Sequence, residues 1–260
     1  MCLVLFAYQP GSHRPLVVAA NRDEFYARPA LGAHHWEDSP HLLAGRDLTA
    51  GGTWLGVTRQ GRFATVTNFA EEGPAGTAAD RELRSRGELV EAFLKGSDSA
   101  HDFARQVHGH DYRGFNLLLF DGRSLVYTCN RGFTEDLGAG VYGLTNAELG
   151  ATWPKVVGGT AALTRLLEAD ACDDALIRLL GDESQPPDSE LPHRGRPIEL
   201  ERRVAPCFIR GDDYGTRAST AVIFEGDEIR FTEQSYAARG VPGARTSYRL
   251  QTGRPAAERE

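Results

Sequence analysis

The first 24 residues constrain the fold of this chain more than any other stretch. Two short apolar runs, residues 2–8 and 16–20, are separated by an interval rich in Gly, Pro and polar residues. Each run has the length of a strand and contains β-branched or aromatic residues, so the pattern predicts two buried strands joined as a hairpin. Because a hairpin brings its outer ends together, Cys2 should lie beside the polar residues 21–24 that end the second run.

Cys2 stands at a position where one residue can supply two reacting groups. Because an initiator methionine that precedes a small residue is commonly removed, we expect Cys2 to carry a free α-amine beside its thiol. An α-amine titrates near ~8 and a thiol near ~8.5, and a nearby cation such as Arg22 lowers the pKa of a thiol. The amine could then accept the proton of its own thiol, which is the chemistry of N-terminal nucleophile hydrolases. The alternative is that Cys2 is a small apolar residue that opens a buried strand.

Length, charge and hydrophobicity narrow the class of protein. The 260 residues are 41% hydrophobic and contain no visible linker or repeat, so we expect a single domain over residues 1–260, peripheral from residue 237 onward. A net charge of −7 does not suggest a nucleic-acid partner. No apolar stretch approaches the ~20 residues that span a membrane, and no signal peptide is recognisable, so we expect a cytoplasmic protein with reduced thiols.

The remaining cysteines and the histidines form no metal motif. Cys129, Cys172 and Cys207 are widely separated, without CxxC or CxxCH spacing, so the sequence predicts neither a zinc site nor covalently attached haem. Residues 25–49 are irregular and rich in Pro, Gly and His, which predicts a long connection forming a lid or rim over Cys2. We expect His34 and His35 in this connection at the surface, with ligation of haem iron as the alternative.

The rest of the chain alternates between runs of strands and pairs of helices. Strands are predicted at residues 52–58, 63–67, 115–120, 124–129, 140–145, 207–210, 217–224 and 228–236. Helices are predicted to begin near residues 85 and 99 and to span residues 153–168 and 173–180, with loops at residues 71–79 and 181–197. Strand runs separated by helix pairs indicate an α+β fold of two antiparallel sheets, packed face to face with helices outside.

Two asparagines stand where predicted strands end. Asn68 follows the strand at residues 63–67, and Asn146 follows the strand at residues 140–145. A carboxamide at such a position can donate a hydrogen bond to the oxyanion of an acyl-transfer reaction. The alternatives are a turn residue at Asn68 and a helix cap at Asn146.

Short motifs in a fixed order identify the chain as resembling a known family. They are Met1-Cys2, Asn21-Arg22-Asp23-Glu24, Arg28-Pro29, Gly51-Gly52-Thr53-Trp54-Leu55-Gly56, Thr67-Asn68-Phe69, Gly143-Leu144-Thr145-Asn146 and Tyr214-Gly215-Thr216-Arg217-Ala218-Ser219-Thr220. The combination resembles the NRDE family, also called the transport-and-Golgi-organisation type 2 family. The resemblance covers residues 1 to 235 and implies an N-terminal nucleophile hydrolase-like fold, a four-layer αββα sandwich.

More distantly, the pattern is similar to bile-salt hydrolases and penicillin V acylases, and this similarity implies a set of site residues. They are Cys2, Arg22, Asp23, Asn68, Asn146 and Arg217. The acylases space their Arg and Asp differently from the adjacent pair here, so Glu24 or Asn21 could take the place of Asp23. An Arg at the start of a strand, such as Arg217, is otherwise usually solvated.

The resemblance and the residues together imply a function. We expect an amidohydrolase or acylase that uses Cys2 as nucleophile and its amine as base, without a required cofactor. Arg22 and Asp23 would tune the thiolate, Asn68 and Asn146 would stabilise the oxyanion, and Arg217 would orient a small-molecule substrate. The alternative implied by the family is a non-catalytic carrier of haem or an acyl-CoA-like lipid on the same scaffold, and a weaker one is an interaction protein.

Overall fold

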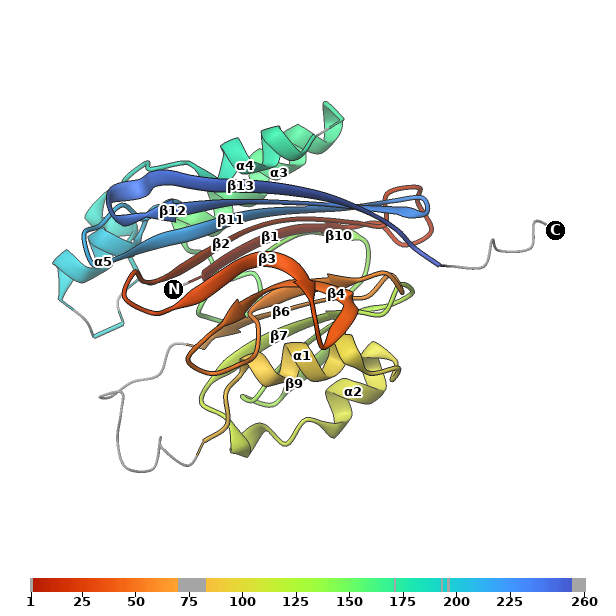
Figure 1. Ribbon diagram of the computed structural model, residues 1–260. Coiled ribbons are helices and arrows are strands. Elements are labelled where there is room, and N and C mark those ends of the chain that lie inside the picture. Colours follow the sequence, from red (N-terminus) through yellow and green to blue (C-terminus); the bar gives the residue numbers. More distant parts are fainter. Residues whose placement is uncertain (1, 70–82, 171, 193, 196, 254–260) are drawn as a thin grey trace.

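The chain forms two stacked sheets between two layers of helices. A computed structural model describes residues 2–69, 83–170, 172–192, 194–195 and 197–253. Figure 1 shows α3 (Pro154–Glu168) and α4 (Asp173–Leu180) over the outer face of one sheet, and α1 (Gly87–Lys95) and α2 (Ala100–Gln106) against the other. The predicted α+β sandwich of four layers, αββα, is confirmed.

The first sheet is antiparallel and carries both ends of the described chain. Its order is β10-β1-β2-β11-β12-β13. The strands are β10 (Gly140–Leu144), β1 (Cys2–Tyr8), β2 (Leu16–Phe25), β11 (Tyr214–Glu225), β12 (Glu228–Ala237) and β13 (Val241–Gln251). The opening hairpin therefore forms as predicted and lies near the middle of the sheet, which explains why its two runs are apolar on both faces.

The second sheet follows the order of the chain. Its order is β3-β4-β5-β6-β7-β8-β9, and every neighbouring pair is antiparallel. The strands are β3 (Ala30–Trp36), β4 (Ser39–Asp47), β5 (Leu55–Thr58), β6 (Phe63–Asn68), β7 (Phe115–Phe120), β8 (Leu125–Cys129) and β9 (Phe133–Asp136). Neighbouring strands of this meander follow one another along the chain, and the connection between β6 and β7 contains α1 and α2.

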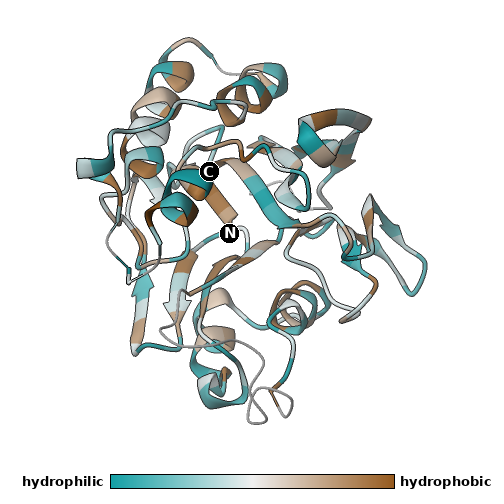
Figure 2. Cartoon of the chain, turned by 90° about the vertical axis from the view of Figure 1, so that its left-hand side faces the viewer, coloured by the Kyte–Doolittle hydropathy of each residue, from teal (hydrophilic) through white to brown (hydrophobic). Residues whose placement is uncertain are grey.

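Three apolar clusters hold the four layers together. On β1, Val4 and Phe6 face the other sheet, whereas Leu3 and Leu5 face α3 and α4, because successive side chains of a strand alternate. A third cluster packs α1 and α2 against the second sheet. Figure 2 shows helices with both hydrophobic and hydrophilic residues, as expected of helices that cover a sheet on one side.

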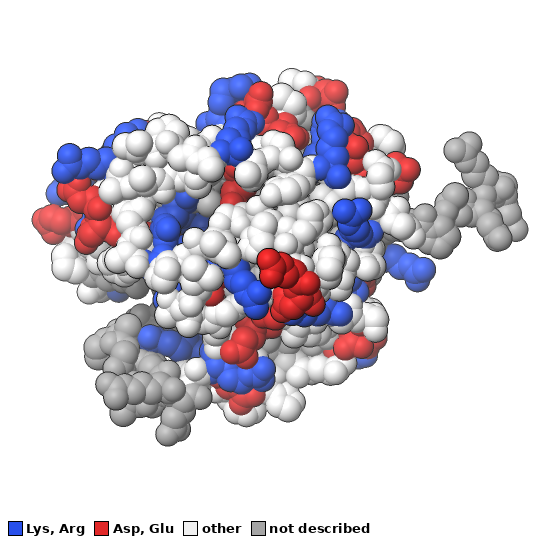
Figure 3. All heavy atoms as spheres, in the orientation of Figure 1, with Lys and Arg blue, Asp and Glu red and all other residues white. Residues whose placement is uncertain are grey.

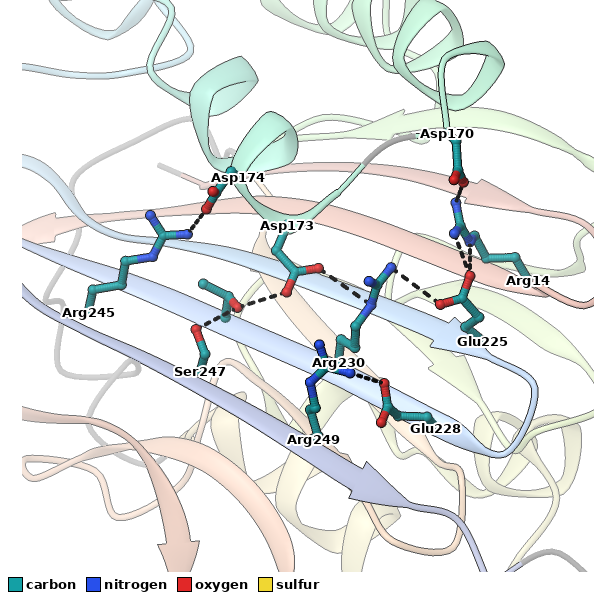
Figure 4. A network of polar contacts seen from close by, with 11 residues as sticks. Arg14, Asp170, Asp173, Asp174, Glu225, Glu228, Arg230, Arg245, Ser247 and Arg249 are labelled. Atoms are coloured by element: carbon teal, nitrogen blue, oxygen red, sulfur yellow. Dashed lines mark hydrogen bonds and ion pairs between the residues drawn. The ribbon is translucent and has the colours of Figure 1, made fainter.

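Charged side chains of both signs lie on the outer surface of the sandwich. On the face shown in Figure 3, Lys and Arg are interspersed with Asp and Glu. Figure 4 shows a polar network that ties the α3–α4 turn to the outer face of the first sheet. In it, Arg14 contacts Asp170 and Glu225, and Asp173 at the start of α4 lies 3.7 Å from Arg230 of β12. Most of these side chains are partly exposed, so each ion pair contributes little to stability.

Several predicted elements differ from the structure. The predicted irregular connection at residues 25–49 is wrong, because β3 and β4 occupy most of it and pair with a register shift that disguises their alternation. The predicted strand at residues 207–210 is also wrong, since that stretch is irregular. Instead, β9 and α5 (Ile198–Val204) form where no element was expected.

The end of the chain also differs from the expectation of a peripheral tail from residue 237. Val241–Gln251 forms β13, which pairs with β12 as the edge strand of the first sheet. Most of its residues are exposed, as expected of an edge strand, and this leaves little hydrophobic pattern to read from the sequence. The predicted loop at residues 71–79 lies outside the described residues.

Candidate functional site

A cleft of about 840 Å³ opens where the two sheets part, at the end of the sandwich that carries Cys2. It is lined by the first sheet through β1, β2, β11 and β12, and by the second through β3, β4 and β6. The segment that leads into α1 closes one side. We call this space the Cys2 cleft. Cys2 is partly exposed as a residue and lines this cleft.

The backbone of Cys2 is held by the residues that end β10. The Cys2 N–H donates to Asn146 Oδ1 at 3.1 Å, and Thr145 Oγ1 donates to the Cys2 carbonyl oxygen at 3.0 Å. Across the hairpin, Cys2 pairs with Arg22. The expected meeting of the thiol with the polar end of the second strand is therefore present, and Asn146 joins it from 144 residues away.

Burial dominates the electrostatics of the Cys2 thiol. Burial raises the pKa of the thiol above its ordinary value, and the charge of Asp23 adds to this effect. Arg22 acts in the opposite direction, as the sequence suggested, but it does not outweigh burial. The resting thiol is therefore protonated, and a base must remove its proton before it can react.

Arg22 is held by a carboxylate that the sequence did not reveal. Its guanidinium lies 3.5 Å from Asp47 and 4.0 Å from Glu24. Asp47 also accepts a hydrogen bond from Arg28 Nε at 2.7 Å, and hydrogen bonds lower its pKa although burial opposes them. Asp47 ends β4, within the stretch expected to be irregular, so no pattern pointed to it. Its Oδ1 accepts hydrogen bonds from the backbone N–H groups of Thr49 and Ala50. An Asp whose side chain bonds to the backbone two or three residues later is typical of a turn, so the sequence could have indicated a turn at Asp47.

Asp23 borders the Cys2 cleft, and its carboxylate lies on the side of β2 that faces the helices. It is 3% exposed, and Thr216 Oγ1 of β11 donates to its Oδ1 at 2.7 Å. Burial raises the pKa of Asp23, while the charge of the N-terminus, followed by Lys155, Thr216 and Arg22, lowers it. The charge of Asp23 in turn raises the pKa of the Cys2 thiol.

The two alternatives to Asp23 are placed differently. The carboxamide of Asn21 is buried and donates to the carbonyl oxygens of Leu180 and Cys207, so it joins β2 to the helix layer. Glu24 lines the Cys2 cleft beside Arg22. Of the two, only Glu24 remains in reach of the cleft.

A β-bulge directs Arg217 into the Cys2 cleft. Thr216 pairs with Asp23 and Ala218 pairs with Arg22, so Arg217 is the extra residue in β11. Regular alternation would place Thr216 and Ser219 on opposite faces, yet both bond to helix-facing side chains of β2. The extra residue in the bulge puts Thr216 and Ser219 on the same face of β11 and lets Arg217 line the cleft.

The guanidinium of Arg217 is held by backbone groups. Its Nη1 donates to the carbonyl oxygens of Phe25 and Arg28, and Arg217 forms no ion pair with any described carboxylate. Burial, followed by the nearby charge of Arg22, lowers its pKa. The charges of Glu24 and Asp47 act on this guanidinium without pairing with it directly. A fixed guanidinium without a direct ion pair is suited to bind an anionic or carbonyl group.

The two strand-terminal asparagines have different surroundings. The Asn68 side chain is exposed at the wall of the cleft, where its amide can reach a ligand. Asn146 is 3% exposed, and its Nδ2 donates to the Asn68 carbonyl oxygen at 2.7 Å while its Oδ1 faces Cys2. The structure therefore places Asn68 on the wall of the Cys2 cleft, and it places Asn146 as a bridge from the Cys2 backbone in one sheet to the Asn68 backbone in the other.

A buried network sets the position of this bridge. Asn116 of β7 donates to Thr67 Oγ1 and to the carbonyl oxygens of Thr145 and Ala147, and it accepts the hydroxyl of Tyr127. All its hydrogen bonds lie between 2.8 and 3.1 Å. Asn116 was not predicted, because one polar residue within an apolar strand does not reveal its partners.

The Gly51-Gly52 motif shapes the wall beside Asp47. Gly51 has a φ of +86°, which L side chains rarely adopt. A Cβ on Gly52 would lie 2.5 Å from the carbonyl carbon of Gly87, where α1 begins. These glycines let the chain turn after Asp47 and pass close to α1.

The histidines expected in a lid lie in a strand instead. His34 and His35 belong to β3; His34 Nδ1 contacts the carbonyl oxygen of Gly32, and the ring of His35 packs edge-on against Tyr248. Neither residue lines the Cys2 cleft. Over the described part of the chain, no group of three His, Cys, Asp or Glu residues could hold a metal ion.

The Cys2 cleft is cationic although the protein as a whole is anionic. The described residues that line it include seven arginines and four acidic residues, an excess of three positive charges, whereas the whole chain carries −7. The arginines are Arg22, Arg28, Arg46, Arg84, Arg86, Arg113 and Arg217. Such a cleft favours a ligand with a negative charge.

Sequence comparison relates the chain to one family. The profile of the family described as Transport and Golgi organisation 2 matches residues 1–238. The Transport and Golgi organization protein 2 homolog of Bos taurus is 37% identical over 264 aligned positions, which cover 90% of this chain and 93% of the bovine protein. The homolog of Homo sapiens is 34% identical with the same coverage.

Structural comparison relates the fold to hydrolases with little sequence similarity. The N-acylethanolamine-hydrolyzing acid amidase ortholog of Caenorhabditis elegans superposes with a TM-score of 0.53 at 10% identity, over 84% of this chain and 91% of that protein. The conjugated bile acid hydrolase of Clostridium perfringens gives 0.50 at 9% identity, over 95% and 92%. At such low identity the likeness shows the fold, the N-terminal nucleophile hydrolase type.

Proposed function

We propose, from the premise that the chain belongs to the Transport and Golgi organisation 2 family, that it hydrolyses an amide or related acyl bond with Cys2 as the nucleophile. The observation that carries the proposal is the geometry of Cys2, which lines an open cleft while Asn146 and Thr145 fix its backbone. The names of the structural neighbours, an amidase and a bile acid hydrolase, support this class of reaction.

The reaction begins with proton transfer within Cys2. Removal of Met1 frees the α-amine, which accepts the thiol proton, so the protonated resting thiol needs no other base. The sulfur then forms a bond to the substrate carbonyl carbon, and the carbonyl electrons move onto oxygen. The side-chain amide of Asn68 donates to this oxyanion from the cleft wall, and Asn146 keeps the amine oriented through its Oδ1.

The reaction ends with two bond cleavages. The tetrahedral intermediate collapses, the C–N bond breaks, and the ammonium of Cys2 gives its proton to the departing amine. Water then attacks the thioester carbon, the C–S bond breaks, and the thiol is restored with release of a carboxylic acid. Arg22 and Asp23 tune the charge around the sulfur, and Arg217 holds an anionic group of the substrate.

Cys2 substitution and mass spectrometry test the proposal. Intact mass should show loss of Met1, and a retained methionine would rule out self-activated catalysis. Against a panel of 7-amino-4-methylcoumarin amides with neutral or anionic acyl groups, Cys2→Ala should lose turnover at least ~100-fold. Cys172→Ala, which removes an exposed thiol elsewhere, is the matched control and should keep it. Equal turnover of Cys2→Ala and the native chain would contradict the mechanism.

A second candidate function is a carrier that binds haem or an acyl-CoA-like lipid without turnover. The excess of arginine in the Cys2 cleft favours it, because such ligands carry carboxylates or phosphates. Titration with haem, followed by the Soret band, and with a fluorescent acyl-CoA should then give saturable binding that Cys2→Ala retains and Arg217→Met weakens. Binding unaffected by Arg217→Met would speak against the cleft as the ligand site.

A further inference from the structure

Lys155 is a buried cation that the proposed reaction does not use. It is the second residue of α3 and is only 6% exposed. Its Nζ donates to the carbonyl oxygens of Val204 at 2.8 Å and Pro206 at 3.4 Å. Among the described residues, no carboxylate lies within ion-pair distance of this ammonium.

This position is costly for a positive charge in two ways. Moving an ammonium from water into the interior of a protein carries a desolvation penalty. In addition, Lys155 lies in the first turn of α3, where the positive end of the helix dipole repels a cation. A methionine would fill similar space without either cost. Because the chain has a lysine here, we expect a negative charge nearby that offsets the cost of burying the ammonium.

Only one buried carboxylate of the described chain suits this role. The buried acidic side chains are Asp23, Glu201 and Glu233. Glu201 is engaged by the guanidinium of Arg194, and Glu233 accepts the amide of Ala33 from the second sheet. Asp23 faces the helix layer, to which Lys155 belongs.

A chain of hydrogen bonds through residues 204–209 connects Lys155 to Asp23. Lys155 bonds to the carbonyl oxygens at the start of this segment, and Asn21 donates to the carbonyl oxygen of Cys207 within it. At its end, Ile209 N donates to Thr216 Oγ1, which itself donates to Asp23. The segment therefore links the ammonium to the Asp23 carboxylate.

We propose that Lys155 is a positioning residue of the Cys2 site, whose buried ammonium keeps the Asp23 carboxylate ionised near the thiol. The inference rests on the proposed function in one respect, since an ionised Asp23 would stabilise the ammonium that forms when Cys2 transfers its proton. Burial lowers the pKa of Lys155 and raises that of Asp23, and each charge counteracts the shift of the other. The other groups that act on Lys155 are Cys207, Arg194 and Cys2.

Titration of the Asp23 carboxyl carbon by NMR tests the inference on the full chain. Because removal of the ammonium disfavours an ionised neighbour, Lys155→Met should raise the Asp23 midpoint by about one pH unit or more. Lys155→Arg should largely restore it. The chain has one other lysine, and Lys95→Met, which removes the same charge from exposed ion pairs on α1, should leave the midpoint unchanged. An unchanged midpoint in Lys155→Met would overturn the inference.

Thermal unfolding keeps the test decisive if Lys155→Met folds poorly. The double variant Lys155→Met with Asp23→Asn removes both charges and should regain a substantial part of the melting temperature lost by Lys155→Met alone. Additive losses would show that the two groups are not coupled.

The pH dependence of turnover separates this inference from the proposed function. For any coumarin amide that the native chain hydrolyses through Cys2, Lys155→Met should shift the acidic limb of the profile to higher pH. If turnover does not depend on Cys2, the hydrolase proposal fails. The NMR titration and the melting temperatures would still test the coupling of Lys155 to Asp23, because neither measurement depends on turnover.

Discussion

Replacing Asp47 by Asn removes one carboxylate that serves two arginines of the Cys2 cleft. Asp47 bonds to Arg28 at 2.7 Å and lies 3.5 Å from Arg22, and the three side chains are 18%, 34% and 12% exposed. A hydrogen bond to a charged group contributes ~1.5–3 kcal/mol and a solvated ion pair ~0–1 kcal/mol. Since the amide oxygen of Asn can still accept from Thr49 and Ala50, we expect a loss of ~2–3 kcal/mol at pH 7.

Urea unfolding followed by tryptophan fluorescence measures this loss. The matched control is Asp38→Asn, because Asp38 also faces two cations, Lys95 and Arg46, but is half exposed and should matter much less. The pKa of Asp47 is lowered in the folded chain, so its contribution is present above the unfolded value of about 4 and is lost as pH falls through the lower folded value. Equal effects of the two substitutions, or a difference from the native chain that persists undiminished in strong acid, would refute the reasoning.

Three further substitutions test other parts of the structure by the same unfolding measurement. Gly52→Ala should cost ~1–3 kcal/mol because its Cβ would lie 2.5 Å from the Gly87 carbonyl carbon, whereas Gly138→Ala, with no atom within 4 Å, should stay within ~0.5 kcal/mol of the native chain. Asn116→Ala should cost ~3 kcal/mol, because it leaves the buried hydroxyls of Tyr127 and Thr67 and two carbonyl groups without this partner; a loss below ~1 kcal/mol would be inconsistent with the network. Burial raises the pKa of Glu233, so its favourable contribution is complete below the unfolded value of about 4.3 and is lost as pH rises through the higher folded value. Stability of Glu233→Gln relative to the native chain should therefore increase with pH over that window, and a flat or falling difference would show that the sign is wrong.

The layered fold and the opening hairpin could be predicted from the sequence because they depend on local patterns. Runs of strand length and turn residues place β1, β2 and the β7–β8 hairpin, and the apolar stripe of α1 marks its buried face. A hairpin joins its ends whatever the rest of the chain does, so Cys2 beside Arg22 followed from the first 24 residues. Strands with weak alternation, such as β3 and β13, carry no such local signal, since their residues are partly exposed and their register shifts.

The sequence alone determined which residues are available for the site, and the tertiary structure decided which way they face. The bulge in β11 exists only through pairing with β2, and it puts Thr216 against Asp23 while Arg217 enters the Cys2 cleft. Asp47 of β4 pairs with Arg22 across 25 positions of sequence, and Lys155 of α3 acts on Asp23 through its charge across 132 positions. The spacing of apolar residues within one strand or helix shows which of its faces is buried, because that spacing depends on the element alone. The pairing of charges across elements depends on how the layers pack, and only the folded chain contains that information.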